Sequence, residues 1–153
     1  MAVDTISINT GLDGFVFPSA ISKISDRKID ATVLFKQAAD FIGIEVLAQT
    51  AAMHVRYLCD FNKHAFLLKV ERFEDTLVLK SNIVYDIYGE VIAKTDFVYS
   101  CRLSMCKDGE AVNSGIVVIA VKSYDDIFKK EVLKEYYRNR LNFCMGNKPS
   151  TIP

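Results

Sequence analysis

The chain has 153 residues, which at about 150 residues per domain predicts one domain spanning residues 1–153. Half of the residues are hydrophobic, a quarter are charged, and 19 basic side chains balance 19 acidic ones, as in a typical soluble globular domain. A formal net charge of zero argues against general DNA or RNA binding, because nucleic-acid binders carry a basic excess.

The longest stretch without a charged residue, residues 111–121, covers eleven residues, whereas a membrane-spanning helix needs about 20. The N-terminal run MAVDTISINT lacks the basic start and apolar run of a secretory signal. The four cysteines include no C-x-x-C pair, and with only two histidines they predict no zinc site. We therefore expect reduced thiols, a cytoplasmic location, and neither a metal nor a cofactor.

A long helix is predicted over residues 35–58, where FKQAADFIGIEVLAQTAAMHVRYL has no proline, one glycine and many good helix formers. The segment is apolar on nearly all sides, which indicates a helix enclosed by other structure. Residues 20–34 before it are predicted to be extended. Glycine is unfavourable in mid-helix, so we expect a strand or another chain to pack closely against Gly43.

Residues 65–122 are rich in β-branched and aromatic residues and predict four strands, at 65–73, 75–89, 90–106 and 110–121. Turns are predicted at residues 88–90 and at 107–109, the second from its Asp-Gly pair. Short turns make neighbouring strands antiparallel, so we expect a four-stranded meander. The last strand contains the apolar run GIVVIAV and should lie centrally, with both faces covered.

A second helix is predicted over residues 123–143, with Ser123 as N-cap and Asp126 at the capping-box position. Its predicted buried side consists of Ile127, Phe128, Val132, Leu133, Tyr136 and Leu141. One buried helix followed by four strands predicts an α+β domain in which an antiparallel sheet wraps around the helix. The core of this domain spans about residues 20–122, and the C-terminal helix follows it.

Polar side chains gather on one side of the first helix. At 100° per residue, Glu45, Gln49 and Arg56 fall within an arc of about 40°, beside Ala52. The opposite side carries Lys36, Asp40 and His54. The stripe is either a solvated face or a ligand site, in which a carboxylate among apolar groups acts as general acid or base and Gln49 orients it. His64, in the loop at residues 60–64, is a further candidate or else an ordinary surface histidine.

The run GIEVLAQTAA, residues 43–52, together with the strand pattern after it, resembles the hot-dog fold. More specifically it resembles 3-hydroxyacyl-thioester dehydratases, which act on acyl carrier protein or coenzyme A substrates. That family carries E-x-x-A-Q on its central helix, matched here by Glu45, Ala48 and Gln49. Residues 65–73 resemble the family's strand after the helix, and residues 107–121 resemble its closing hairpin, so the likeness covers about residues 20–122.

The resemblance implies a dimer whose sheets join edge to edge, with tunnels for the acyl chain at the interface. It also implies a histidine that removes the proton next to the thioester carbonyl, and Glu45 as the acid that protonates the departing 3-hydroxyl. Backbone N–H groups at the helix start polarise the carbonyl. We expect Ala38, Ile42 and Ala52 to border the substrate.

Two parts of the family pattern are absent. The family's histidine falls at Ala31 here, and the Pro-Gly pair that opens its helix falls at Ala39 and Asp40. His64 of the same or the partner chain is the candidate replacement for the missing base.

Three functional hypotheses follow from the resemblance. The first is a 3-hydroxyacyl-thioester dehydratase of fatty-acid or polyketide and polyene metabolism, with catalytic Glu45 and Gln49. The second is a hot-dog acyl thioesterase, in which Glu45 activates water or attacks the carbonyl. The third is a catalytically silent acyl-binding subunit of an active dehydratase. The partners expected are the acyl thioester and a second chain, in a homodimer or in a heterodimer with a related subunit.

Overall fold

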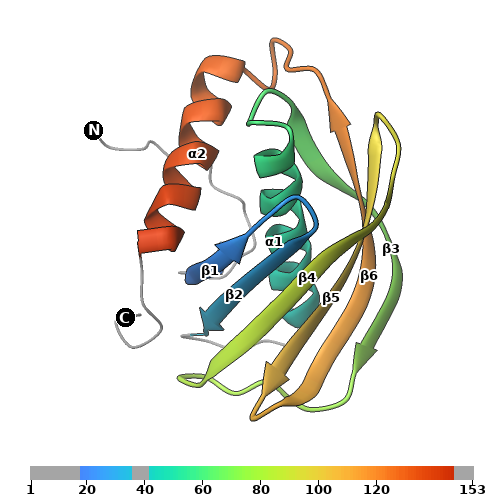
Figure 1. Ribbon diagram of the computed structural model, residues 1–153, viewed down its shortest axis with the longest axis vertical. Helices are drawn as coiled ribbons and strands as arrows, with labels where there is room; N and C mark the ends of the chain where they lie inside the picture. The colour runs from blue at the N-terminus through green and yellow to red at the C-terminus, as the bar shows by residue number, and fades with distance from the viewer. Residues whose placement is uncertain (1–17, 36–41, 147–153) are drawn as a thin grey trace.

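The computed structural model describes residues 18–35 and 42–146 of the chain. Within these residues, one antiparallel sheet curves around the first of two helices (Figure 1). The elements in chain order are β1 (Ala20–Ile24), β2 (Lys28–Leu34), α1 (Ile42–Leu58), β3 (His64–Asp75), β4 (Val84–Lys94), β5 (Val98–Lys107), β6 (Glu110–Lys122) and α2 (Lys130–Gly146). The predicted α+β architecture is confirmed.

The strand order in the sheet is β1-β2-β4-β5-β6-β3, and all neighbours are antiparallel. The predicted four-strand meander is wrong, because the sheet has six strands and β3 pairs with β6 and not with β4. The connection at residues 76–83 carries the chain past the ends of β5 and β6, which hydropathy alone does not reveal. As a result β3 forms one edge of the sheet, and β1, on which α2 packs, forms the other.

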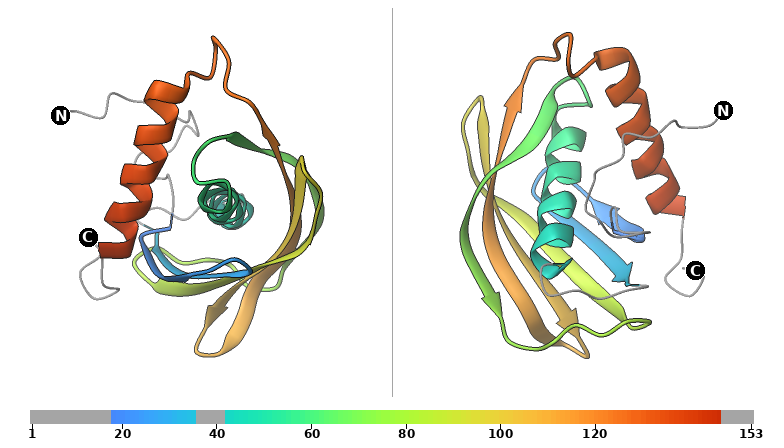
Figure 2. Two further views of the ribbon diagram at one scale, coloured as in Figure 1. Left: turned by 45° about the horizontal axis from the view of Figure 1, so that its top comes forward. Right: turned by 180° about the vertical axis from the view of Figure 1, so that it is seen from behind.

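The helix α1 is enclosed because its side chains are apolar on most sides. Val46, Leu47 and Met53 have no exposed surface. Figure 2 (left) looks down α1 and shows the sheet bending around it. The predicted enclosed helix is confirmed, but Phe35 lies before it as a buried core residue, and residues 36–41 are outside the described part of the chain.

Two residues of α1 fix its position against the sheet. A Cβ atom on Gly43 would overlap the side-chain amide of Asn113 in β6, so the close packing expected at this glycine is confirmed. On another side of the helix, His54 Nε2 lies 2.7 Å from the carbonyl oxygen of Ser25 and ties α1 to the β1–β2 turn. Burial lowers the pKa of His54 although the hydrogen bond to Ser25 raises it, so the ring is neutral and holds a structural position.

The two predicted turns have different outcomes. Asp108 and Gly109 have φ angles of 53° and 82°, as a tight hairpin between β5 and β6 requires, and this turn is confirmed. The turn at residues 88–90 is wrong, because Gly89 lies within β4. A Cβ there would come within 2.8 Å of Ile29 Cγ2 on β2, so this glycine serves close packing between side chains instead of a turn.

The apolar run of β6 lies where the sequence predicts it. β6 has β5 on one side and β3 on the other, and residues 117–121 are at most 8% exposed on either face. Within the described part of the chain, no helix has the length and apolar character needed to cross a membrane. The four cysteines are free thiols.

The second helix begins later than predicted. Asp125 Oδ1 accepts hydrogen bonds from the backbone N–H groups of Ile127 and Phe128, at 2.9 and 2.7 Å, and residues 123–129 form a loop. The predicted N-cap at Ser123 is therefore wrong, because Asp125 stabilises a local turn that competes with the helix. α2 starts at Lys130 and continues to Gly146.

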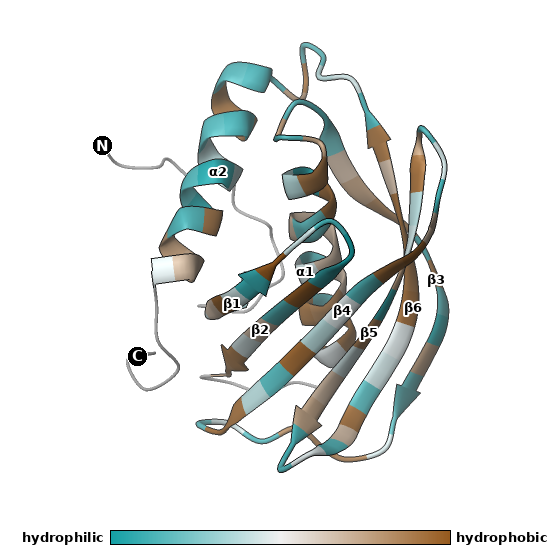
Figure 3. Ribbon diagram, viewed as in Figure 1, coloured by the Kyte–Doolittle hydropathy of each residue, from teal (hydrophilic) through white to brown (hydrophobic). Residues whose placement is uncertain are grey.

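The predicted buried side of this helix is confirmed at Leu133 and Leu141 and wrong at other positions. The buried residues are Leu133, Tyr137, Leu141 and Cys144. Val132 and Ile127, which were predicted to be buried, are 51% and 83% exposed. Most of the remaining surface of α2 is hydrophilic (Figure 3).

Candidate functional site

A cleft of about 240 Å³ follows the one polar stripe of α1. Its floor is made by five residues of the helix, Glu45, Ala48, Gln49, Ala52 and Arg56. Its walls are residues 65–67 of β3 and Tyr137 of α2. Figure 2 (right) shows α1 between these two elements. The spacing predicted from the sequence therefore corresponds to a real concave surface.

Glu45 and Gln49 form the polar pair at one end of the cleft. Gln49 Nε2 donates a hydrogen bond to Glu45 Oε1 at 3.3 Å, as residues one helical turn apart can do. Both side chains are half-buried. Ala48 and Ala52 are small enough to leave space beside the carboxylate. The pair can thus present an oriented carboxylate to a ligand in the cleft.

Arg56 lies at the other end of the cleft and is only 4% exposed. Its Nη2 donates to the carbonyl oxygen of Ala65 at 2.9 Å, and its guanidinium carbon lies 3.6 Å from the centre of the Tyr137 ring. The alternative of a solvated stripe is therefore wrong at Arg56, because β3 and α2 cover this end of α1.

His64 does not join Glu45 within one chain. Its ring stacks on Phe128, with centroids 4.2 Å apart, and lies at the Arg56 end of the cleft. Burial, with help from the positive charges of Arg56 and Lys122, lowers the pKa of His64 to about 4. The imidazole is therefore a neutral and weak base, held among aromatic rings.

The remaining predicted substrate contacts are divided. Ala52 lines the cleft, as expected. Ile42 is 2% exposed and belongs to the hydrophobic core, apart from the residues that line the cleft. Ala38 lies outside the described residues.

The sequence matches no protein-family model and no curated protein. Solved structures do match. A thioesterase from Pseudomonas aeruginosa has a TM-score of 0.59 at 12% identity, over 67% of this chain and 80% of that one. A thioesterase from Haemophilus influenzae has a TM-score of 0.57 at 9% identity, over 67% and 77%. The dehydratase heterocomplex ApeI:P from Xenorhabdus doucetiae has a TM-score of 0.59 at 13% identity, over 74% and 86%.

The chain has the hot-dog fold. In this fold the sheet wraps around a central helix, which here is α1. The stripe that carries Glu45 lies on the side of α1 that the sheet of its own chain leaves open. At identities of 9–13% the likeness extends to the fold and not to the chemistry.

Sequence reasoning missed part of this hot-dog cleft. Tyr137 was not expected there, because the predicted buried side of the second helix included its neighbour Tyr136 instead. Phe66 and Leu67 lay in a predicted strand, but no local signal indicates which strand borders α1.

Among the described residues, no cluster of three His, Cys, Asp or Glu side chains is suited to hold a metal ion.

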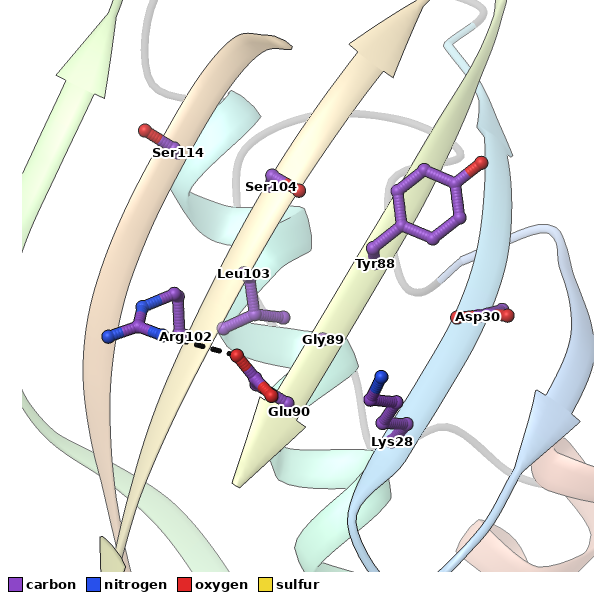
Figure 4. A pocket seen from close by; sticks show the side chains of 9 residues that line it. All are labelled: Lys28, Asp30, Tyr88, Gly89, Glu90, Arg102, Leu103, Ser104 and Ser114. Carbon is purple, nitrogen blue, oxygen red and sulfur yellow. Dashed lines mark hydrogen bonds and ion pairs between the residues drawn. The ribbon is translucent and has the colours of Figure 1, made fainter. Parts of the chain in front are cut away.

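A second hollow, of about 290 Å³, lies on the outer face of the hot-dog sheet, with α1 behind the strands (Figure 4). Its lining includes Lys28 and Asp30 of β2, Tyr88 and Glu90 of β4, and Arg102 of β5. Its Glu90 carboxylate and Arg102 guanidinium form an ion pair at 3.2 Å. Since these two charges pair with one another at an exposed surface, they are not free to bind a charged group of a ligand. The α1 cleft is therefore the better candidate site.

Proposed function

We propose that the α1 cleft binds the acyl group of a thioester of acyl carrier protein or coenzyme A, and that the chain is a subunit of a 3-hydroxyacyl-thioester dehydratase. The observation that carries this proposal is the Glu45 carboxylate, held by Gln49 in a cleft with small neighbours. The fold shared with the dehydratase heterocomplex supports it.

Dehydration needs an acid and a base. The bond from C3 to the hydroxyl oxygen breaks, and protonated Glu45 gives its proton to the departing oxygen, so that water leaves. A base removes the proton at C2, and the electron pair of that C–H bond forms the C2–C3 double bond. One positioned acid or base of this kind contributes about 10²- to 10⁴-fold to the rate.

Among the described residues neither histidine is placed to act as the base beside Glu45, so the proposal takes the base from a second chain. Within one chain, His54 is engaged with Ser25, and His64 is at the far end of the cleft from Glu45. The two ends of the cleft, Glu45 and Arg56, are separated by on the order of 16 Å at the helical rise of 1.5 Å per residue.

The free edge of β3 is the place where a second chain docks. β3 lines the cleft through Phe66 and Leu67, and these residues with Leu68 and Val70 are 37–53% exposed. An exposed apolar edge strand is a surface for strand pairing. A chain paired with β3 would extend the sheet and close the cleft over its ligand.

Two kinds of second chain are compatible with this geometry. The end of β3 at Asp75 lies near Glu45, because Asp75 pairs with Asn113 and Asn113 touches Gly43. In an antiparallel β3–β3 pair of identical chains, the partner's His64 would lie toward this end. The aromatic packing and low pKa of His64 make it a poor base, however. We therefore favour a heterodimer in which a related subunit supplies the histidine.

Thioester hydrolysis is the second candidate, favoured by the presence of a carboxylate and an amide without a histidine among the described lining residues. In that reaction Glu45 takes a proton from water, the water oxygen bonds to the carbonyl carbon, and the C–S bond breaks. The proton then passes to the thiolate, and free thiol is released.

Mass spectrometry separates these reactions. The tagged chain is isolated with the proteins that co-purify from its own cells, mixed with 3-hydroxyacyl thioesters, and followed for loss of water and release of thiol. We expect loss of water, reduced at least about 10²-fold in Glu45→Gln. Glu90→Gln is the matched control, because this exposed carboxylate lies on the outer face of the sheet and should keep full activity.

The other outcomes contradict the proposal in distinct ways. Release of thiol that depends on Glu45 would establish the hydrolase. Binding of the acyl thioester without either product would make the chain a silent acyl-binding subunit. Activity that survives in Glu45→Gln would remove Glu45 from the chemistry altogether.

A further inference from the structure

The guanidinium of Arg56 has hydrogen-bonding capacity that the described part of the chain does not use. Its Nε and Nη1 atoms are buried without a hydrogen-bond partner. Only Nη2 is engaged, with the Ala65 carbonyl oxygen. No described carboxylate lies within ion-pair distance of Arg56, although the exposed arginines 72, 102 and 138 each have one.

A buried guanidinium with unpartnered N–H groups is unfavourable unless a ligand or a second chain supplies the acceptors. A buried charge without an ionic partner costs several kcal/mol, and a buried donor without an acceptor adds to that. Burial accordingly lowers the pKa of Arg56 below its usual value. The ring of Tyr137 covers one face of the guanidinium and compensates in part, while Nε and Nη1 have no hydrogen-bond acceptor among the described residues.

The position of Arg56 relates this unused capacity to the ligand. The residue lines the same cleft as Glu45, on the same stripe of α1 and three helical turns further along. Between the two charged ends lie Ala48 and Ala52, with Phe66 and Leu67 opposite. The cleft therefore presents a carboxylate at one end, an apolar middle and a guanidinium at the closed end.

We propose that Arg56 binds a carboxylate at the far end of the acyl chain, so that the preferred ligand is an acyl thioester whose chain ends in a carboxylate instead of a methyl group. This inference rests on the proposed function, since it takes the cleft as the acyl site. The planar fork of a guanidinium matches the two oxygens of a carboxylate, and Tyr137 lies over the face of that fork, so the ring does not compete with an in-plane partner.

The ligand has to displace protein atoms to make this contact. The two unpartnered nitrogens are covered when the cleft is empty. A side chain of the cleft therefore rotates as the carboxylate arrives. Phe66 and Leu67 are 37% and 43% exposed and have the freedom to do so.

A purely structural role is the competing explanation. Arg56 joins α1 to β3 through Ala65 and to α2 through Tyr137, and any substitution weakens those contacts. The ratio of the dissociation constants of two ligands, measured on the same protein, is insensitive to this effect, because a loss of structure weakens the binding of both ligands.

The experiment uses amide-linked coenzyme A analogues, which do not turn over, in pairs of equal chain length that end in methyl or in carboxylate. Isothermal titration calorimetry measures both dissociation constants over a range of lengths. At the best length we expect the carboxylate analogue to bind about 10- to 100-fold tighter, as charge-assisted hydrogen bonds provide. Arg56→Gln should bring this ratio close to one, and Arg56→Lys should keep part of it.

Arg102→Gln is the matched control, because it removes an exposed arginine from the outer face of the sheet and should leave the ratio as it is. Equal or tighter binding of the methyl analogues at every length would overturn the inference and leave the proposed function standing. An unchanged ratio in Arg56→Gln would overturn it as well. If neither series binds, either as coenzyme A analogues or with the same acyl groups carried on acyl carrier protein, the proposed function itself fails.

If Arg56→Gln does not fold, the ratio in the unchanged protein and in Arg56→Lys still decides the matter. A change of oligomeric mass in Arg56→Gln, with no ligand preference in the unchanged protein, would assign the guanidinium to a carboxylate of a second subunit instead.

Discussion

At the scale of single residues, the two histidines show how burial determines chemistry. Only His64 was a predicted site residue, but both histidines are buried in the folded chain. His54 is held by a carbonyl oxygen and His64 by aromatic rings, and each has a lowered pKa because of burial first of all. A neutral, buried imidazole stabilises the fold only while it remains unprotonated.

We predict that the chain loses stability as the pH falls from about 6.5 toward 4. In that window His64 is protonated in the unfolded chain, at its ordinary pKa, but not in the folded chain. The unfolded state therefore binds more protons, so the free energy of unfolding decreases as the pH is lowered. His64→Phe keeps an aromatic ring between Phe66 and Phe128 and should lose less. Urea unfolding at several pH values measures this, and identical losses in both proteins would contradict it.

At the scale of elements, α2 shows that a local signal can shift the register of a helix. Ser123 and Asp126 form a reasonable capping pattern, yet Asp125 bonds to Ile127 and Phe128 and delays the helix. The existence of α2 and the burial of Leu133 and Leu141 were predictable from the sequence. The exposure of Ile127 and Val132 was not, because the loop before α2 and the packing of the helix decide it.

The substitution Tyr137→Ala tests that buried face. Tyr137 is 5% exposed and packs on Arg56, so its truncation should lower the free energy of unfolding by about 3–5 kcal/mol. Val132→Ala, on the exposed face, should change it by less than about 0.5 kcal/mol. Equilibrium unfolding in urea compares the two. A larger effect at Val132 would restore the register predicted from the sequence.

At the scale of the whole molecule, the sheet is closed off on one side only. The edge at β1 is covered by α2, whereas β3 exposes apolar side chains next to the cleft. An uncovered edge of this kind favours association with a second chain. The proposed function depends on that association, because the missing base and the roof of the cleft both come from it.

We predict that the chain, isolated with the proteins that co-purify from its own cells, is found in two-subunit complexes and not at its own mass of 17.2 kDa. The double substitution Leu68→Lys and Val70→Lys places charges on the free edge and should yield monomers, measured by light scattering. Phe97→Lys is the control, because this residue is 65% exposed in the β4–β5 turn and should not affect the mass. A chain that stays monomeric both by itself and when isolated with the proteins that co-purify from its own cells would contradict docking on β3.

Local features of the sequence were sufficient for the enclosed helix, the Glu45–Gln49 pair, the Asp-Gly hairpin and the apolar strand β6. Each depends on neighbours in the chain: helical spacing, turn chemistry or an apolar run. The pairing of β3 with β6, the role of Gly89 and the burial of Arg56 depended on the tertiary structure. These three features arise where segments far apart in the sequence come into contact. The residue pattern along one segment does not indicate which other segment packs against it.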